Sequence, residues 1–122
     1  MNQDRTVRPG DVLVAALPSR SPGGHEQTGT RPVVVVAVPI GPLRYPVVVV
    51  APLTTRVGRW ADANPSVYVW LRAGAGGLPS EATVLLDQVG SIDVRRILGY
   101  LGTLDNEDSD RVLTNLRNMF GS

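Results

Sequence analysis

Two short polar segments hold the side chains of this chain that are best suited to chemistry. The first is His25-Glu26-Gln27 with Arg31, and the second is Thr54-Thr55-Arg56. An arginine fork donates two parallel hydrogen bonds to a phosphate, and a threonine hydroxyl can donate one more. If the apolar runs 33–38 and 47–53 pair as an antiparallel hairpin, Arg31 and Thr54 lie at neighbouring strand ends and form an anion site. A plainer interpretation is that Arg31 pairs with Glu26 and the threonines cap the strand end.

Most other catalytic chemistries lack the residues that they require. The chain has one histidine and no cysteine, whereas a zinc site takes about three or four histidine, cysteine or carboxylate ligands. No GxSxG nucleophile elbow, P-loop or GxGxxG segment occurs in the sequence. We therefore expect no metal and no cofactor.

The composition predicts a folded cytoplasmic protein. The chain has 122 residues, of which 43% are hydrophobic and 19% charged, so we expect a single domain over residues 1–122 with a real core. The N-terminus lacks the apolar segment of a signal peptide, and the apolar runs are too short to span a membrane. All 12 basic residues are arginine. High-GC codon usage explains this more simply than a preference for phosphate does.

Apolar segments rich in β-branched residues predict five or six short strands. They are Val12–Leu17, Val33–Val38, Val47–Leu53, Val67–Leu71, Thr83–Leu86 and Ile97–Leu104. Loops are expected at 18–30, 39–45 and 73–79, an irregular polar segment at 56–65, and a short helical turn at 91–96. The two valine-rich strands are expected to be buried on both faces, and their surplus of apolar surface favours a homodimer.

The C-terminal segment has the apolar period of an α-helix. Its apolar face comprises Val112, Leu113, Leu116, Met119 and Phe120. Asp105 or Asn106 can cap the start of this helix. The sequence therefore predicts a mainly β (α+β) fold, with a small, strongly bent antiparallel sheet or barrel and a C-terminal α-helix.

Four short motifs are spread along nearly the whole chain. They are Pro9-Gly10-Asp11-Val12, Glu26-Gln27-x-Gly29-x-Arg31-Pro32, Ala51-Pro52-Leu53-Thr54-Thr55-Arg56, and Leu86-Asp87-Gln88-Val89 with Ser91-Ile92-Asp93 and Arg95-Arg96. Each motif alone is weak. The ordered set resembles the MazF/PemK family of toxin endoribonucleases, which belong to type II toxin–antitoxin systems.

The resemblance implies an SH3-like barrel, a homodimer, and metal-independent, sequence-selective cleavage of single-stranded RNA. Cleavage of mRNA to 2′,3′-cyclic phosphate and 5′-hydroxyl ends would inhibit translation and growth. A cognate antitoxin is also implied, whose C-terminal segment occupies the RNA groove. On this resemblance we assign catalysis to Arg31, Thr54 and Glu26. The residues assigned to substrate binding are Gln27, His25, Thr55, Arg56 and Gln88.

The sequence leaves open which residue acts as the general base. Arginine is a poor base because its pKa exceeds about 12, so the base is Glu26, His25 or neither. His25 departs from the family pattern, which tends to have a small residue there. The loop 18–30 is longer than is usual in the family, and Gly90 stands where a basic residue is common.

Two other classes of function also suit a small barrel. One is a non-catalytic toxin similar to the CcdB-like proteins that bind DNA gyrase, and the other is an SH3-like binding module. A phosphate-directed pair such as Arg31 with Thr54 favours the ribonuclease. Trp60, Tyr68 and Trp70 could stack unpaired bases, although packing explains at least one of these aromatic residues.

Overall fold

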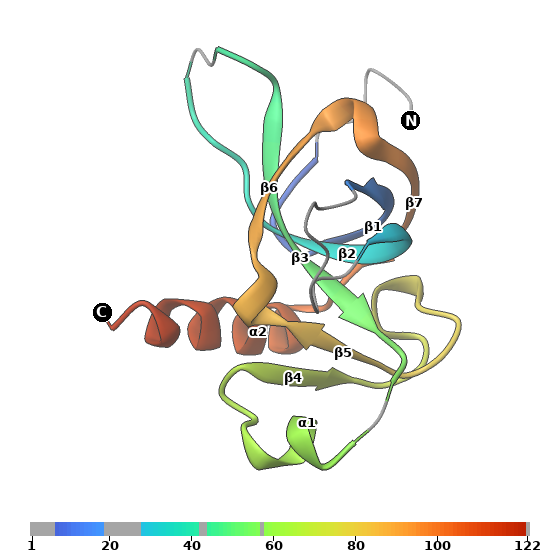
Figure 1. Cartoon of the computed structure of the whole chain (residues 1–122), viewed down its shortest axis with the longest axis vertical. Coiled ribbons are helices and arrows are strands. Elements are labelled where there is room, and N and C mark those ends of the chain that lie inside the picture. The colour runs from blue at the N-terminus through green and yellow to red at the C-terminus, as the bar shows by residue number, and fades with distance from the viewer. Residues whose placement is uncertain (1–6, 19–27, 42–43, 57, 122) are drawn as a thin grey trace.

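The computed structural model describes residues 7–18, 28–41, 44–56 and 58–121 (Figure 1). Its strands are β1 (Asp11–Leu17), β2 (Gly29–Ala37), β3 (Val47–Thr54), β4 (Tyr68–Leu71), β5 (Ala82–Leu85), β6 (Gly90–Asp93) and β7 (Ile97–Thr103). Its α-helices are α1 (Arg59–Ala63) and α2 (Asn106–Met119). Single 3₁₀ turns lie at Ala75–Gly77, Leu86–Gln88 and Val94–Arg96. Among these described helices, none is long and apolar enough to cross a membrane.

The strands form one strongly bent antiparallel sheet. Their order is β4-β5-β3-β2-β1-β7, with β6 also paired to β3. Because β4 and β7 stand at opposite ends of this order, the sheet does not close. Figure 1 shows β4 and β5 as a separate layer between α1 and the rest of the sheet. The predicted mainly β fold with a C-terminal helix is confirmed, although the described residues form 7 strands and not five or six.

Strand β3 joins the two halves of the sheet. Residues Val49 to Pro52 of β3 pair with β2, and the last pair of that ladder is Val33 with Pro52. Its final residues, Leu53 and Thr54, pair instead with β5, where Thr54 lies opposite Thr83. The strand therefore leaves β2 at the point where the predicted site residues begin.

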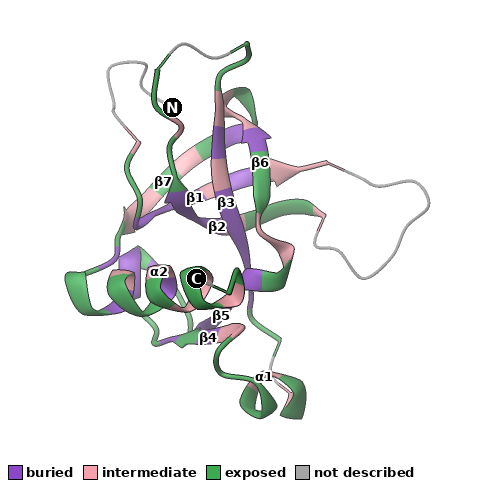
Figure 2. Cartoon of the chain, turned by 90° about the vertical axis from the view of Figure 1, so that its left-hand side faces the viewer, coloured by how far each residue is buried: buried purple, intermediate pink, exposed green. Residues whose placement is uncertain are grey.

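Two apolar cores lie on opposite faces of the sheet. Val34 and Val36 of β2 belong to one core, and Val33 and Val35 belong to the other. All four are at most 6% exposed, and Figure 2 shows buried residues along β1, β2 and β3. The prediction of burial on both faces is confirmed for residues 33–36, whereas Ala37 and Val38, at the end of the predicted strand, are exposed. Because one chain already buries the four valines, they offer no surplus for a dimer surface, and the homodimer stays a prediction without that argument.

The C-terminal helix α2 begins and ends at identifiable residues. Asp105 caps its start, since its side chain accepts a hydrogen bond from the amide of Asp108 at 2.8 Å, as the sequence predicted. Val112 is buried in the core. The placement of Phe120 on the apolar face is wrong, because the helix ends at Met119 and Phe120 is 68% exposed. Gly121, with φ +76°, turns the chain away.

The prediction of a helical turn over Ser91–Arg96 is only partly right. Its first half extends as β6, because this segment pairs with β3 and buries Ile92 in one of the two cores. The 3₁₀ turn is confined to Val94–Arg96, where the Asp93 side chain caps it. Burial of one isoleucine and pairing with a neighbouring strand outweigh the turn preference of the glycine and serine.

Helix α1 was not predicted from the sequence, which indicated irregular structure over 56–65. It is one short helix without a buried residue, so no apolar period marks it. Trp60 of this helix contacts the ring of Tyr68 edge-on, with centroids 4.9 Å apart and ring planes at 86°. This aromatic contact attaches α1 to β4.

Candidate functional site

Arg31 is an exposed residue of β2 whose guanidinium is largely available. It lies opposite Ala15 of β1, and its Nε donates to the carbonyl oxygen of Thr28 at 3.0 Å. Among the described residues, its two terminal nitrogens form no ion pair. This hydrogen bond orients the side chain, and within the described part of the chain the two terminal nitrogens keep their capacity to donate.

Thr54 is the last residue of β3 and is 4% exposed. Its Oγ1 accepts a hydrogen bond from the amide of Arg56 at 3.2 Å. This is the strand-end cap that the plainer interpretation expected. A hydroxyl that accepts in this way keeps its hydrogen for donation to a ligand oxygen. Capping the strand and donating to an anion are therefore compatible roles.

The Arg31 and Thr54 side chains project from one face of the sheet. Residues two apart on a strand share a face, as do residues paired across strands. Val33 pairs with Pro52, so Arg31, two residues before Val33, shares a face with Thr54, two residues after Pro52. No hydrogen bond joins these two side chains, because β3 has turned toward β5 at Thr54. A ligand would have to bridge the gap between them.

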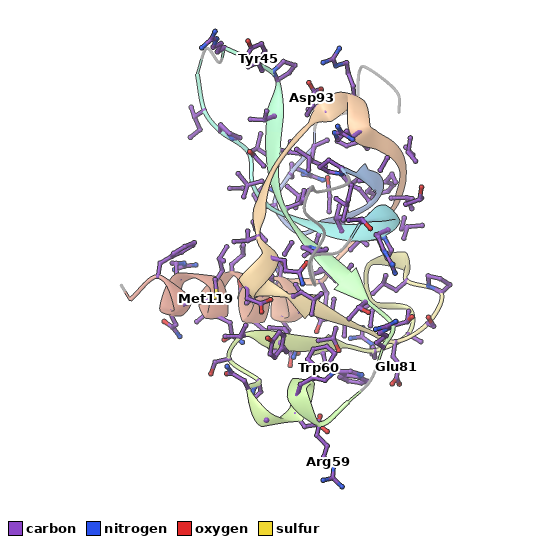
Figure 3. The ribbon with its side chains drawn as sticks, viewed as in Figure 1. Tyr45, Arg59, Trp60, Glu81, Asp93 and Met119 are labelled. Atoms are coloured by element: carbon purple, nitrogen blue, oxygen red, sulfur yellow. The ribbon has the colours of Figure 1, made fainter. Side chains whose placement is uncertain are left out.

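A shallow hollow at the end of β3 holds three of the predicted site residues. It is lined by Thr54, Thr55 and Arg56 from β3 and its continuation, and by Trp70, Glu81, Ala82 and Thr83 from β4 and β5. Figure 3 shows Glu81 at the start of β5, beside the end of β3. Thr55 and Arg56 are exposed, so the hollow carries a cationic group next to the buried hydroxyl of Thr54. The assignment of Thr54, Thr55 and Arg56 to catalysis and substrate binding stays a prediction.

Gln88 lies at a second cavity, of about 240 Å³. The residues that line it are Leu17, Pro18, Val50, Pro52, Asp87, Gln88, Val89, Gly90, Ser91 and Ile92. Val50 and Pro52 alternate along β3 on the same face as Thr54. Gln88 therefore lies beside Val50 and Pro52, on the face that carries Thr54, and its assignment to substrate binding stays a prediction.

Asp87, in the same cavity as Gln88, is held by Tyr68. The Tyr68 hydroxyl donates to Oδ2 of Asp87 at 2.8 Å. This hydrogen bond is the largest of three causes that raise the pKa of Tyr68 above its ordinary value. The other two are partial burial and the negative charge of the Asp87 carboxylate. Tyr68 therefore remains a neutral donor at physiological pH, and Asp87 keeps further lone pairs to accept hydrogen bonds from a ligand.

Three predicted site residues, His25, Glu26 and Gln27, lie outside the residues that the structure describes. Their assigned roles in catalysis and substrate binding stay predictions. The alternative in which Arg31 pairs with Glu26 stays open for the same reason.

The residues Glu81, Thr83 and Asp87, which line the two hollows, were not assigned from the sequence, and Trp70 was named there only as one of three aromatic residues that could stack bases. Thr83 could have been found as the one polar residue within a short, otherwise apolar strand. Asp87 directly precedes Gln88 in the fourth motif. Nothing in the sequence pairs Trp70 with Thr54, because their proximity depends on how β4, β5 and β3 are ordered.

The bent open sheet with a C-terminal helix defines a small β protein in which Arg31 and Thr54 project from one face of the sheet. Residues 8–120 match the family described as PemK-like, MazF-like toxins of type II toxin–antitoxin systems. The chain belongs to this family. It is also 35% identical over 107 residues to the endoribonuclease EndoA of Bacillus subtilis, with 87% of each chain covered.

Solved structures share the fold. The MazF structure from Deinococcus radiodurans superposes with a TM-score of 0.72 at 23% identity, covering 98% of this chain and 100% of that chain. A mycobacterial endoribonuclease in complex with its cognate antitoxin gives a TM-score of 0.63 at 20% identity, with 92% and 90% covered. At these identities the likeness supports the fold.

Proposed function

We propose that this toxin is a metal-independent endoribonuclease that cuts single-stranded RNA, with Arg31 and Thr54 as its catalytic pair. The endoribonuclease class is supported by the relative at 35% identity. The observation that carries the catalytic assignment is the position of Arg31 and Thr54 at adjoining ends of β2 and β3, on one face.

The proposed reaction is an internal transfer at phosphorus. The 2′-hydroxyl oxygen of one nucleotide bonds to the adjacent phosphorus as the P–O5′ bond breaks. The 2′-hydroxyl proton is removed and the leaving O5′ gains a proton, which leaves a 2′,3′-cyclic phosphate and a 5′-hydroxyl. The charge on the non-bridging oxygens rises in the transition state, so fixed donors that face them accelerate the reaction.

Arg31 and Thr54 supply such donors. The terminal nitrogens of Arg31 make two parallel hydrogen bonds to the phosphoryl oxygens. Thr54 donates its hydroxyl hydrogen, because its oxygen already accepts from Arg56. Loss of one such donor reduces the rate on the order of 100-fold or more. The proton acceptor is Glu26, His25 or neither.

The proposed partners follow from the family and its solved relatives. Because one structural relative is in complex with its cognate antitoxin, we infer an antitoxin for this chain as well, whose C-terminal segment occupies the RNA groove. A homodimer and a cytoplasmic location complete the proposal.

The test uses purified protein and a short single-stranded RNA in EDTA. We expect cleavage to survive EDTA and to leave a 2′,3′-cyclic phosphate. Arg31→Ala and Thr54→Val should remain folded by circular dichroism and lose about 100-fold in rate or more. A strict requirement for added divalent metal, a 5′-phosphate product, or a folded Arg31→Ala protein with near wild-type activity would contradict the proposal.

A further inference from the structure

The exposed ring of Trp70 is the aromatic surface nearest to the proposed catalytic threonine. Trp70 is 52% exposed, whereas the ring of Trp60 is engaged edge-on with Tyr68. Among the described residues, Trp70 makes no aromatic ring contact. Its backbone carbonyl accepts a hydrogen bond from Arg111 at 3.1 Å. The backbone of Trp70 is thus fixed while its ring stays open to solvent.

Strand pairing sets Trp70 in line with Thr54. Trp70 of β4 lies opposite Thr83 of β5, and Thr83 lies opposite Thr54 of β3. Paired residues share a face, so the three side chains form one row across three strands. Neighbouring strands are about 4.8 Å apart, which places the Trp70 backbone about 10 Å from that of Thr54. This spacing is comparable to the reach of one nucleotide.

The charges around this row determine which part of a bound RNA strand faces which side chains. Exposed Arg56 stands beside Thr54, and exposed Arg31 lies on the same face. Glu81 lines the hollow at Thr54 together with Arg56, and it also lines a larger adjoining hollow beside Trp70. The cation of that larger hollow, Arg111, already donates to Asp108 and to the Trp70 carbonyl. Phosphates are attracted to the arginine side and repelled by Glu81. A base carries no charge and offers a flat ring, so it is the part of the nucleotide suited to the Trp70 side.

We propose that Trp70 stacks the unpaired base of a nucleotide adjacent to the scissile phosphate, and so positions the RNA on Thr54. The inference rests on the proposed ribonuclease function. Stacking on an aromatic side chain tolerates any base, so Trp70 supplies affinity and alignment, and sequence selection comes from other contacts. The side chain is a substrate-binding residue beyond those assigned from the sequence.

The first experiment compares kcat/KM on one short RNA for wild type, Trp70→Ala and Trp70→Phe. We expect Trp70→Ala to lower kcat/KM about 10-fold or more, and Trp70→Phe to stay within a few-fold. The matched control is Trp60→Phe, which changes the other exposed tryptophan. Tyr45→Ala provides a second control, because Figure 3 shows Tyr45 at the far end of the molecule from Glu81. Both controls should cleave like wild type.

A second experiment locates the stacked base. Abasic nucleotides are placed singly on each side of the scissile phosphate and combined with Trp70→Ala. We expect one abasic position to cost wild type about as much as Trp70→Ala does, and to cost the Trp70→Ala protein nothing further. If wild type cleaves the unmodified RNA, but the loss from the abasic nucleotide adds to the loss from Trp70→Ala at both positions, the stacking role is overturned.

A third measurement separates this inference from the ribonuclease proposal. The chain has 2 tryptophans, so Trp60→Phe leaves Trp70 as the only indole reporter. A 2′-O-methyl RNA lacks the attacking hydroxyl. Saturable quenching of the Trp70 fluorescence by this RNA would support base stacking on Trp70 even if wild type cuts no RNA. If wild type cleaves RNA without such quenching and Trp70→Ala cleaves equally well, base stacking on Trp70 is refuted and the proposed ribonuclease function stands.

Discussion

Replacement of Asp108 by alanine should destabilise the protein at neutral pH, because this carboxylate joins β4 to α2. The Asp108 side chain is 8% exposed and accepts hydrogen bonds from Arg72 at 2.9 Å and Arg111 at 3.0 Å. Arg111 also donates to the carbonyl of Trp70. Loss of the carboxylate leaves Arg72 with its longer contact to Asp105, at 3.6 Å, and Arg111 with its hydrogen bond to Trp70. It therefore loosens the strand that carries Trp70.

The magnitude follows from the exposure of the partners. Removing one member of a buried ion pair costs about 3 to 5 kcal/mol when the other charge stays buried. Here the Arg72 and Arg111 side chains are 56% and 44% exposed, so water can solvate them once Asp108 is gone. We therefore expect a smaller loss, of about 1 to 2 kcal/mol. For a chain of this size, that lowers Tm by about 4 to 8 °C.

The pH dependence of this loss has a definite sign. Burial raises the pKa of Asp108, but the hydrogen bonds from Arg111 and Arg72 outweigh it, so the folded pKa lies below the ordinary 3.8. A carboxyl with a lowered folded pKa stabilises the fold above its unfolded pKa and loses that contribution as pH falls through the folded value. The Tm difference between wild type and Asp108→Ala should be full at pH 7 and should shrink below pH 3.8.

Thermal unfolding by circular dichroism at neutral and acidic pH measures this difference. Arg95→Ala is the matched control, because it removes an ion pair to Asp93 at the same distance of 2.9 Å, but with Arg95 86% exposed. Solvent screening should leave its Tm nearly unchanged. Equal losses in the two variants, or a Tm difference for Asp108→Ala that grows as pH falls, would refute the reasoning.

Three further predictions concern activity and assembly. Arg31→Lys should recover little of the rate lost in Arg31→Ala, because an ammonium does not reproduce the two parallel hydrogen bonds; near-complete recovery would argue for charge alone. If His25 is the general base, the rate should rise with pH near pH 6.5, roughly the ordinary pKa of histidine, and His25→Ala should abolish that rise. If Glu26 is the base, the rise should lie at about pH 4.3 and depend on Glu26. We expect a small effect at His25 and an intermediate one at Glu26, so a large loss confined to His25→Ala would contradict us. Light scattering at micromolar concentration should give the mass of a dimer, and a monomer mass would count against the proposed homodimer.

The strands were predictable where one local pattern determined them. Continuous valine runs marked β2 and β3, and Asp105 before an apolar period marked α2. The missed elements depend on distant partners. Strand β6 forms because it pairs with β3 and buries Ile92 in one of the two cores. Helix α1 has no buried residue and contacts β4 through Trp60 and Tyr68. The same limit applies to the site, since Thr54 follows a visible strand end but its neighbours Thr83 and Trp70 come from strands ordered by tertiary pairing.

The position of the site follows from two prolines. Pro52 forms the last pair of the β2–β3 ladder, and Pro32 directly precedes Val33, its partner. Proline has no amide hydrogen to donate to a ladder, so the two strands separate beyond this pair. Arg31 directly precedes Pro32 and Thr54 follows Pro52 by two residues, so both lie on one face where β2 and β3 no longer pair with each other. Each stays fixed by its other neighbour, Arg31 through β1 and Thr54 through β5. A valine-rich ladder that ends at prolines therefore separates Arg31 from Thr54, while the proposed role of each residue depends on the different neighbouring strand that holds it.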